Sequence, residues 1–155
     1  MIRFWIVAVA MVTALQATAQ TPAPAPAWRG YDEAADARAD IAQGQAQAAA
    51  SGKRVLVVFG ANWCGDCRVL DTAMKQGRLK ALMDRRFVIV KVDVARFDKN
   101  VDIAQRYGAP LKKGIPTVAV LAADGSASFV TTGGELASAR SMGEDELVRF
   151  FERPF

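Results

Sequence analysis

Two cysteines, the only ones in the chain, lie three positions apart where a strand-like run gives way to a helix-compatible run. The apolar stretch Val55-Leu56-Val57-Val58-Phe59 within residues 54–59 has the pattern of a strand buried on both faces. The motif Trp63-Cys64-Gly65-Asp66-Cys67 follows, and a helix is predicted from about Cys64 to Gln76. The chain must therefore fold so that a buried strand leads through a short turn into a helix that begins at a cysteine.

This placement of the cysteines favours thiol–disulfide chemistry. Unpaired N–H groups and a partial positive charge at a helix N-terminus make a cysteine there ionise more easily than a free thiol. The thiolate is the attacking species in disulfide exchange, and two thiols at this spacing can close and reopen a small disulfide ring. We therefore expect a redox-active pair, Cys64 and Cys67, that needs no organic cofactor.

A metal-binding pair is the alternative that the cysteines leave open. A structural zinc site needs four cysteines, or two cysteines and two histidines, and the chain has only two cysteines and no histidine. Two thiolates could still hold Cu(I), assisted by a methionine such as Met74 or Met142. A copper-delivery module that uses the same two cysteines is thus the second hypothesis. In the first hypothesis, the redox-active pair, no residue is assigned as a metal ligand.

Composition excludes several other classes of function. Without histidine, the chain has no His-based general base, no Cys–His nucleophile pair and no His metal site. The formal net charge of +4 is a mild imbalance and there is no dense Lys/Arg run, so we expect no nucleic-acid partner.

The first residues have the pattern of a secretory signal peptide. Arg3 supplies the positive charge, Phe4 to Leu15 is an apolar stretch interrupted only by Thr13, and Ala17-Thr18-Ala19 is a small-x-small cleavage site. The apolar core is short of the ~20 residues that a membrane-spanning helix needs. We therefore predict a signal peptide over 1–19, cleavage after about Ala19, a periplasmic or secreted protein, and no stable membrane insertion after cleavage.

Residues 20–30 are rich in proline and alanine and predict an extended tether, so the domain is expected to span 31–155. Within it, an Ala-rich helix is predicted from Tyr31 to Ala50, with Gly44 as its weak point. The remaining elements are predicted as strands over 87–94, 116–122 and 126–132, helices over 78–85 and 100–107, and a closing helix behind a capping box at Ser141 to Glu144. Crossover helices imply parallel strands early in the chain, and the Asp124-Gly125 turn implies an antiparallel hairpin later.

The combination of these features resembles the thioredoxin family over roughly residues 53–151. The resemblance includes the strand before the motif, Trp63, the segment Gly114-Ile115-Pro116-Thr117 at a strand start, the terminal hairpin and the final helix. It implies the α/β thioredoxin fold, with a central mixed sheet of four to five strands flanked by helices. The helix from Tyr31 resembles the extra N-terminal helix of secreted thioredoxin-like proteins.

The same resemblance implies roles for individual residues. Cys64 would be the nucleophile, the more exposed sulfur of the two, and Cys67 the resolving thiol. Pro116 would be a cis-proline facing the disulfide, with the backbone of Ile115 binding an extended substrate segment, while Trp63 would form an apolar wall beside the sulfurs. The alternatives are that Pro116 merely begins a strand and that Trp63 merely fills the core.

Two departures from the thioredoxin pattern concern charge near the sulfurs. The thioredoxin family has a buried aspartate in the strand before the motif, and Val58 occupies that position here. Lys91 occupies the position of the lysine that pairs with this aspartate. The alternative is that Lys91 is a solvated lysine at the end of a strand. Asp66 lies between the cysteines beside Gly65, and its carboxylate opposes formation of a nearby thiolate. Asp66 could instead act as a base through water, or be a solvated first-turn residue.

We therefore predict an exported thiol–disulfide oxidoreductase. It would reduce or exchange disulfides of other proteins through a mixed disulfide at Cys64 that Cys67 resolves, and a separate redox partner protein would exchange electrons with it. The site would be supported by Trp63, Gly65, Asp66, Ile115 and Pro116. The basic loop at residues 109–113 could favour acidic partner surfaces, or be an ordinary solvated loop.

Overall fold

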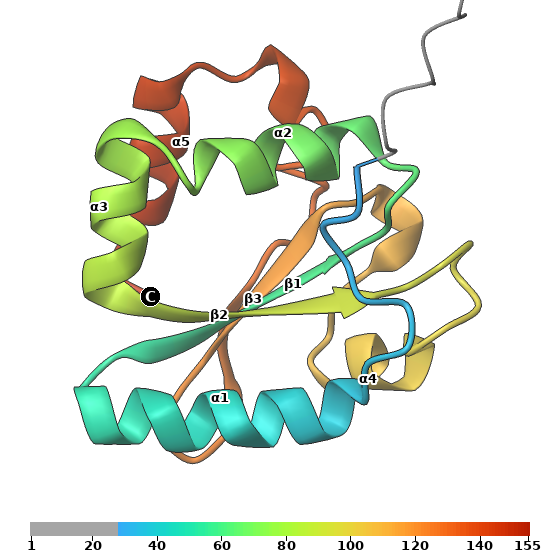
Figure 1. The fold of residues 1–155 in the computed structure, drawn as a ribbon, viewed down its shortest axis with the longest axis vertical. Coiled ribbons are helices and arrows are strands. Elements are labelled where there is room, and N and C mark those ends of the chain that lie inside the picture. The colour runs from blue at the N-terminus through green and yellow to red at the C-terminus, as the bar shows by residue number, and fades with distance from the viewer. Residues whose placement is uncertain (1–27) are drawn as a thin grey trace, which may run out of the picture.

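The computed structural model describes residues 28–155, so the predicted signal peptide and most of the predicted tether lie outside the described residues (Figure 1). A four-stranded sheet lies between two layers of helices, in the strand order β2-β1-β3-β4. The strands are β1 (Arg54–Gly60), β2 (Phe87–Asp93), β3 (Thr117–Leu121) and β4 (Ala127–Val130). β1 and β2 are parallel, whereas β3 is antiparallel to both β1 and β4, which confirms the mixed sheet with four strands.

The helices divide between the two faces of the sheet, as Figure 1 shows. One face is covered by α1 (Ala37–Ser51) and α4 (Val101–Arg106). The other face is covered by α2 (Gly65–Ala73), α3 (Gly77–Arg86) and α5 (Glu144–Phe151). Two short 3-10 helices, η1 (Leu111–Lys113) and η2 (Ala139–Ser141), lie in the connections before β3 and before α5. None of the helices in this part of the chain is apolar over a length that could cross a membrane.

Each face of the sheet has its own core because successive strand residues point to opposite faces. Val55, Val57 and Phe59 of β1 enter a core that also holds Tyr31 and both cysteines, which we call the cysteine core. Leu56 and Val58 enter a core of aliphatic side chains, methionine and phenylalanine, which we call the phenylalanine core. β1 is thus buried on both faces, as its sequence predicted.

The N-terminal helix is present but begins later than predicted. Asp36 is its N-cap, and its Oδ1 accepts hydrogen bonds from the N–H groups of Arg38 and Ala39 at 3.0 and 3.1 Å. An aspartate at the N-cap favours the start of a helix there, because its carboxylate accepts hydrogen bonds from N–H groups that have no partner within the helix. The predicted helical start at Tyr31 is therefore wrong, and Tyr31 lies in a non-helical segment before α1.

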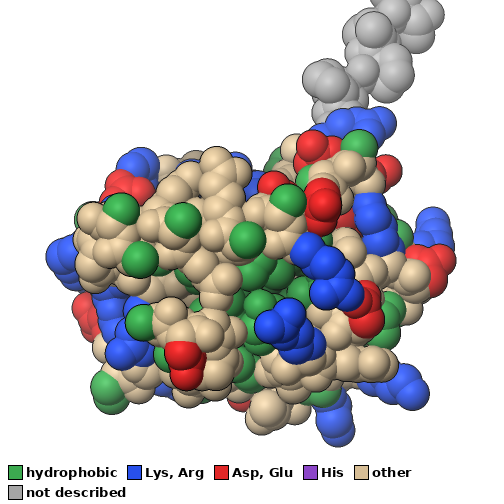
Figure 2. Space-filling model, turned by 90° about the horizontal axis from the view of Figure 1, so that it is seen from below, with side chains coloured by type: hydrophobic (Ala, Val, Ile, Leu, Met, Phe, Trp, Pro, Cys, Tyr) green, Lys and Arg blue, Asp and Glu red, His purple; other side chains and the backbone are tan. Residues whose placement is uncertain are grey.

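The outward face of α1 carries little charge. Figure 2 views this side of the molecule and shows small hydrophobic side chains among uncharged groups over part of the face, with charged side chains around its edge and near its middle. This agrees with the sequence from Ile41 to Ser51, which has no charged residue. Gly44 faces inward, where an added Cβ would collide with Val90 of β2, so the predicted weak point is a close helix–sheet contact.

The predicted capping box before the last helix is wrong. Gly143 is the N-cap of α5 and no side chain caps that helix, while Ser141 ends η2. Glu144 instead reaches the start of α3, where its Oε1 accepts a hydrogen bond from the N–H of Arg78 at 2.7 Å. The carboxylate therefore caps a helix far away in the sequence, which a local pattern cannot reveal.

Candidate active site

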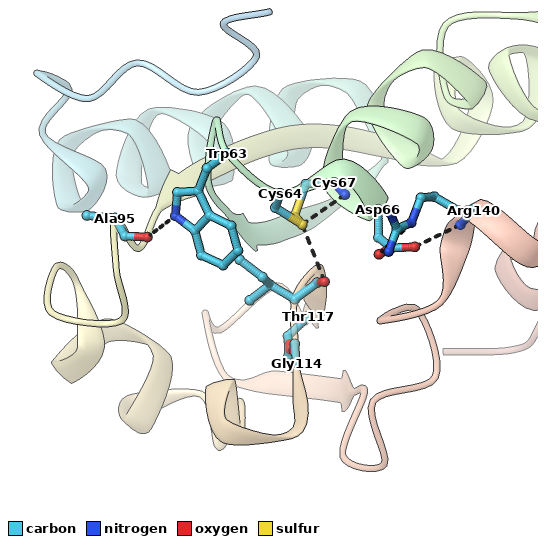
Figure 3. The surroundings of a disulfide bond; sticks show 9 residues. Trp63, Cys64, Asp66, Cys67, Ala95, Gly114, Thr117 and Arg140 are labelled. Atoms are coloured by element: carbon cyan, nitrogen blue, oxygen red, sulfur yellow. Dashed lines mark hydrogen bonds and ion pairs between the residues drawn. A yellow bond between two sulfur atoms is a disulfide. The ribbon is translucent and has the colours of Figure 1, made fainter.

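Cys64 and Cys67 form a disulfide at the N-terminus of α2, near the ends of β1 and β2 (Figure 3). Cys64 is the N-cap residue, with extended backbone angles, and its Sγ accepts a hydrogen bond from the N–H of Cys67 at 3.1 Å. An N–H group aimed at this sulfur would stabilise negative charge on it after reduction. Both residues are buried, with Cys64 5% and Cys67 1% exposed, so the predicted nucleophile is the less buried residue of the pair.

The segment before β3 lies against the disulfide. The Ile115–Pro116 peptide bond is cis, as the family resemblance predicted. The carbonyl oxygen of Ile115 lies 3.5 Å from Cys64 Sγ, so this backbone is beside the sulfur where a bound segment would have to pass. The hydroxyl of Thr117 donates a hydrogen bond to the carbonyl of Gly114 at 2.7 Å, which holds the turn leading into β3. The structure thus brings Ile115 and Pro116 together with the two cysteines.

Trp63 stands beside the disulfide with about half of its surface exposed, at 52%. Its Nε1 donates a hydrogen bond to the carbonyl of Ala95 at 2.7 Å, and its ring meets Phe97 edge to face at 5.8 Å between centroids. Phe97 is also exposed, at 43%. This degree of exposure excludes core filling as the role of Trp63 and leaves an apolar surface next to the sulfurs.

Asp66 is buried and ion-paired, so the interpretation of it as a solvated first-turn residue is wrong. Its Oδ1 accepts a hydrogen bond from the backbone N–H of Arg140 at 2.9 Å, and its Oδ2 lies 3.2 Å from Arg140 Nε. Figure 3 shows Arg140 meeting Asp66 from the η2 side. The guanidinium also lies against Gly65, 3.3 Å from where a Cβ would be. Arg140 therefore adds a positive charge to the turn that carries the cysteines, which no local pattern predicted.

A second buried carboxylate, Asp71, lies one turn beyond Cys67 on α2 and was missed by the sequence analysis. Its Oδ1 lies 3.0 Å from Lys91 Nζ and its Oδ2 lies 2.7 Å from Lys75 Nζ. Burial raises the pKa of the Asp71 carboxyl, but the hydrogen bonds and charges of the two lysines outweigh it and leave that pKa below its usual value.

Lys91 pairs across the sheet with Val58, the position where the thioredoxin pattern has its aspartate. The lysine predicted from the family pattern therefore has an acidic partner, but that partner comes from helix α2 and not from β1. The spacing of four residues from Cys67 to Asp71 places both on one side of the helix and could have pointed to it.

The basic loop before the cis-proline is a short helix. Residues 111–113 form η1, with Lys112 and Lys113 exposed, and Gly114 follows with a φ of 112°, a value that favours glycine. These lysines precede the Ile115 carbonyl by two and three residues. Any segment bound along that backbone would pass close to positive charge.

Comparisons with known proteins agree with this geometry. A family model described as thioredoxin-like matches residues 36–123. A disulphide isomerase from Xylella fastidiosa Temecula1, solved as a crystal structure, is 43% identical, with 79% of this chain and 93% of that chain covered and a TM-score of 0.76.

Two further relatives are more distant. A thioredoxin from Chlorobaculum thiosulfatiphilum is 37% identical over 71 residues, which is 46% of this chain and 58% of that protein, so the match spans less than two thirds of its length. The oxidised C-terminal domain of DsbD from Neisseria meningitidis is 24% identical, with a TM-score of 0.55 and 76% of this chain and 95% of that chain covered. That last likeness concerns the fold alone.

Proposed function

The chain belongs to the thioredoxin-like family, and from this premise we propose that it is an exported thiol–disulfide oxidoreductase that reduces or exchanges disulfides in other proteins. The observation that carries the proposal is the Cys64–Cys67 disulfide at the N-terminus of α2, with Cys64 the less buried residue of the pair and the Ile115 backbone beside it. The likeness to a protein described as a disulphide isomerase supports thiol–disulfide oxidoreductase activity.

The reaction proceeds through two exchanges. In the reduced protein the Cys64 thiolate attacks one sulfur of the partner's disulfide, so a mixed disulfide forms and the partner's other sulfur leaves as a thiolate. The Cys67 thiol then loses its proton and attacks Cys64, which closes the ring disulfide and releases the partner's second sulfur. The partner gains two electrons and two protons, and a separate redox protein must reduce Cys64–Cys67 again. The disulfide itself is the redox group.

Surface chemistry supports a protein partner. Trp63 and Phe97 present exposed apolar area beside the sulfurs, and the Ile115 backbone can bind an extended segment by hydrogen bonds. Lys112 and Lys113 favour acidic side chains in that segment.

Export is proposed from the sequence of the first 19 residues. Arg3, the apolar stretch from Phe4 to Leu15 and the Ala17-Thr18-Ala19 site together support cleavage after Ala19 and release into a compartment that permits disulfides. N-terminal sequencing of protein recovered from the periplasm or medium tests this step. An uncleaved N-terminus in the membrane fraction would contradict it.

Insulin reduction tests the activity. The purified protein should accelerate insulin precipitation by dithiothreitol, and Cys64→Ser should abolish this acceleration because the single remaining thiol, Cys67, cannot close the ring disulfide that completes the reduction. Cys67→Ser should instead accumulate a mixed disulfide with the substrate, visible on a non-reducing gel, because the resolving thiol is missing. Tight stoichiometric binding of Cu(I) without any insulin reduction would overturn the proposal in favour of a copper carrier.

A further inference from the structure

Tyr31 lies at the active site although it precedes the first helix. It is only 3% exposed and belongs to the same core as the two cysteines. Trp28 packs against its ring edge to face at 6.0 Å between centroids. The segment before α1 is therefore anchored at the disulfide end of the molecule.

Asn62, two residues before Cys64, holds the backbone of Tyr31 from both sides. Its Oδ1 accepts a hydrogen bond from the Tyr31 N–H at 2.9 Å, and its Nδ2 donates one to the Tyr31 carbonyl, also at 2.9 Å. The side-chain amide thus makes the same two hydrogen bonds that the backbone of a neighbouring β-strand would make, and these bonds fix the Tyr31 backbone in position. The turn that carries the cysteines thus positions Tyr31 directly.

The Tyr31 hydroxyl is a neighbour of the resolving sulfur. Gly60 lies between them: a Cβ at this position would come within 3.0 Å of both the Tyr31 hydroxyl oxygen and Cys67 Sγ. Both atoms therefore border the same open position at Gly60, although no hydrogen bond joins them in the disulfide form that the described residues show. Within residues 28–155 no side chain is a hydrogen-bond partner of the hydroxyl, so it is free to turn toward Cys67.

The Tyr31 ring also lies near the half-buried ion pair of Lys91 and Asp71. Lys91 Nζ lies 5.8 Å from the ring centroid, and Asp71 fixes Lys91 at 3.0 Å. Burial, followed by the charges of Asp71 and Asp93, raises the pKa of the Tyr31 hydroxyl far above its ordinary value. The hydroxyl therefore keeps its proton and can act only as a neutral donor or acceptor.

We propose that the Tyr31 hydroxyl donates a hydrogen bond to the Cys67 sulfur as that sulfur becomes negatively charged, with Asn62, Lys91 and Asp71 as the residues that position it. In the resolving step the Cys67 S–H bond breaks, its proton passes to solvent, and the sulfur's electron pair forms the bond to Cys64. The bond between Cys64 and the partner's sulfur breaks, and that sulfur leaves with the bonding pair and takes up a proton. Tyr31 supplies no proton to the products. It lowers the free energy of the charged intermediate state.

Charged groups from several elements surround Tyr31, and their charges also act on its hydroxyl. They are the carboxylates of Asp71 on α2 and Asp93 on β2, with the lysines that pair with them, Lys75, Lys91 and Lys99. Asp71 accepts hydrogen bonds from two lysines, whereas Asp93 Oδ2 lies 3.6 Å from Lys99 Nζ and accepts no hydrogen bond from the described residues. A negative charge on Cys67 therefore has no surplus of positive charge to meet it, and a neutral donor such as the Tyr31 hydroxyl can stabilise it.

The inference rests on the proposed function only where it says that the hydrogen bond assists turnover. The test therefore measures the pKa of the Cys67 thiol directly and does not depend on enzymatic activity. In a Cys64→Ser background, Cys67 is the only thiol, and its pKa can be followed by the ultraviolet absorbance of the thiolate. Tyr31→Phe keeps the ring and its packing and removes the hydroxyl. We expect it to raise the Cys67 pKa by about one unit, a roughly tenfold loss of thiolate at a given pH.

Tyr107→Phe is the matched control, because Tyr107 is the only other tyrosine, is also buried, and lies at the end of α4. An unchanged Cys67 pKa in Tyr31→Phe, or an equal shift in Tyr107→Phe, would overturn the inference, with circular dichroism checking that each variant is folded. Insulin reduction by the protein with both cysteines separates the two ideas. If Tyr31→Phe shifts the Cys67 pKa but the parent protein does not reduce insulin, the proposed function is contradicted and the inference about Tyr31 stands.

Discussion

The two cores of this protein differ in what their side chains can do. The phenylalanine core is built from apolar side chains, and Phe151 meets both Phe87 and Phe150 edge to face. The cysteine core contains a disulfide and a tyrosine hydroxyl, and buried carboxylates lie at its margin. On one face of the sheet, apolar packing dominates and charge enters through arginines over the rim rings, Arg86 over Phe87 and Arg153 over Phe150. The other face accommodates groups whose redox or protonation state can change.

The largest expected effect is on the free energy of unfolding, when phenylalanine is replaced by alanine once in the phenylalanine core and once beside the cysteines. Phe151 is fully buried in the phenylalanine core, whereas Phe97 is 43% exposed beside Trp63. Phe151→Ala should lower the free energy of unfolding by about 3–5 kcal/mol, because it removes buried area and leaves a cavity. Phe97→Ala should cost less than about 1 kcal/mol. Urea denaturation of the oxidised proteins measures both.

The same pair of variants should behave in the opposite way toward substrate. Phe97→Ala should raise the KM for a protein disulfide, since apolar contact area beside the sulfurs is lost, while folded Phe151→Ala should keep the KM and the reduction potential of the parent. A large potential change in Phe151→Ala would show that the two cores are not separate in function.

A smaller effect is expected from crowding the cysteine core. Gly60→Ala would place a methyl group against the Tyr31 hydroxyl and Cys67 Sγ. We expect a loss of about 1–3 kcal/mol in the free energy of unfolding, together with a slower resolving step. Gly143→Ala is the control, because nothing lies within 4 Å of that position and its φ of −79° suits any residue. Equal stability of the two variants would contradict the close packing described around Gly60.

The Asp71 ion pair should show itself through pH. Asp71→Asn should lower the free energy of unfolding by about 1–2 kcal/mol at neutral pH, because charged hydrogen bonds from two lysines are lost. The pKa of Asp71 is depressed in the folded protein, so its contribution is present above the carboxyl's ordinary pKa and disappears as pH falls through the folded value. The difference between variant and parent should therefore vanish in acid.

Asp84→Asn is the control for that measurement, because Asp84 forms an exposed pair with Lys80 on α3. It should change the free energy of unfolding by no more than about 0.5 kcal/mol at any pH. If Asp71→Asn keeps its full deficit below the ordinary carboxyl pKa, the stabilisation does not come from the ionised carboxylate.

The smallest expected effect is electrostatic and concerns Asp66 and Arg140. Asp66→Asn removes a negative charge next to the disulfide, which stabilises the Cys64 thiolate and should raise the reduction potential, by about 30 mV or less because Arg140 already offsets the carboxylate. Arg140→Met should lower the potential. Equilibration with a glutathione buffer measures both, and shifts of the same sign would rule out charge as the cause.

The sequence predicted the elements whose signals are local. The run at 54–59, the motif from Trp63 to Cys67 and the Asp124-Gly125 turn each correspond to a strand, a helix start or a hairpin in the structure. Two local patterns failed, the helical start at Tyr31 and the capping box at Ser141. In the first, Asp36 is a local N-cap that starts the helix later, and in the second, Glu144 binds the distant N–H of Arg78 and not its own helix.

What the sequence by itself determined is the scaffold and the reacting atoms: a strand, two cysteines on the first turn of a helix, and a proline before the strand that faces them. Only the tertiary structure decided the surroundings of the sulfurs. Asp66 meets Arg140 across 74 positions, Asp71 meets Lys91 across 20, and Tyr31 meets Asn62 across 31. Hydrophobic periodicity and secondary-structure propensity describe only a few neighbouring residues. These contacts instead depend on which helices cover each face of the sheet, and tertiary packing determines that arrangement.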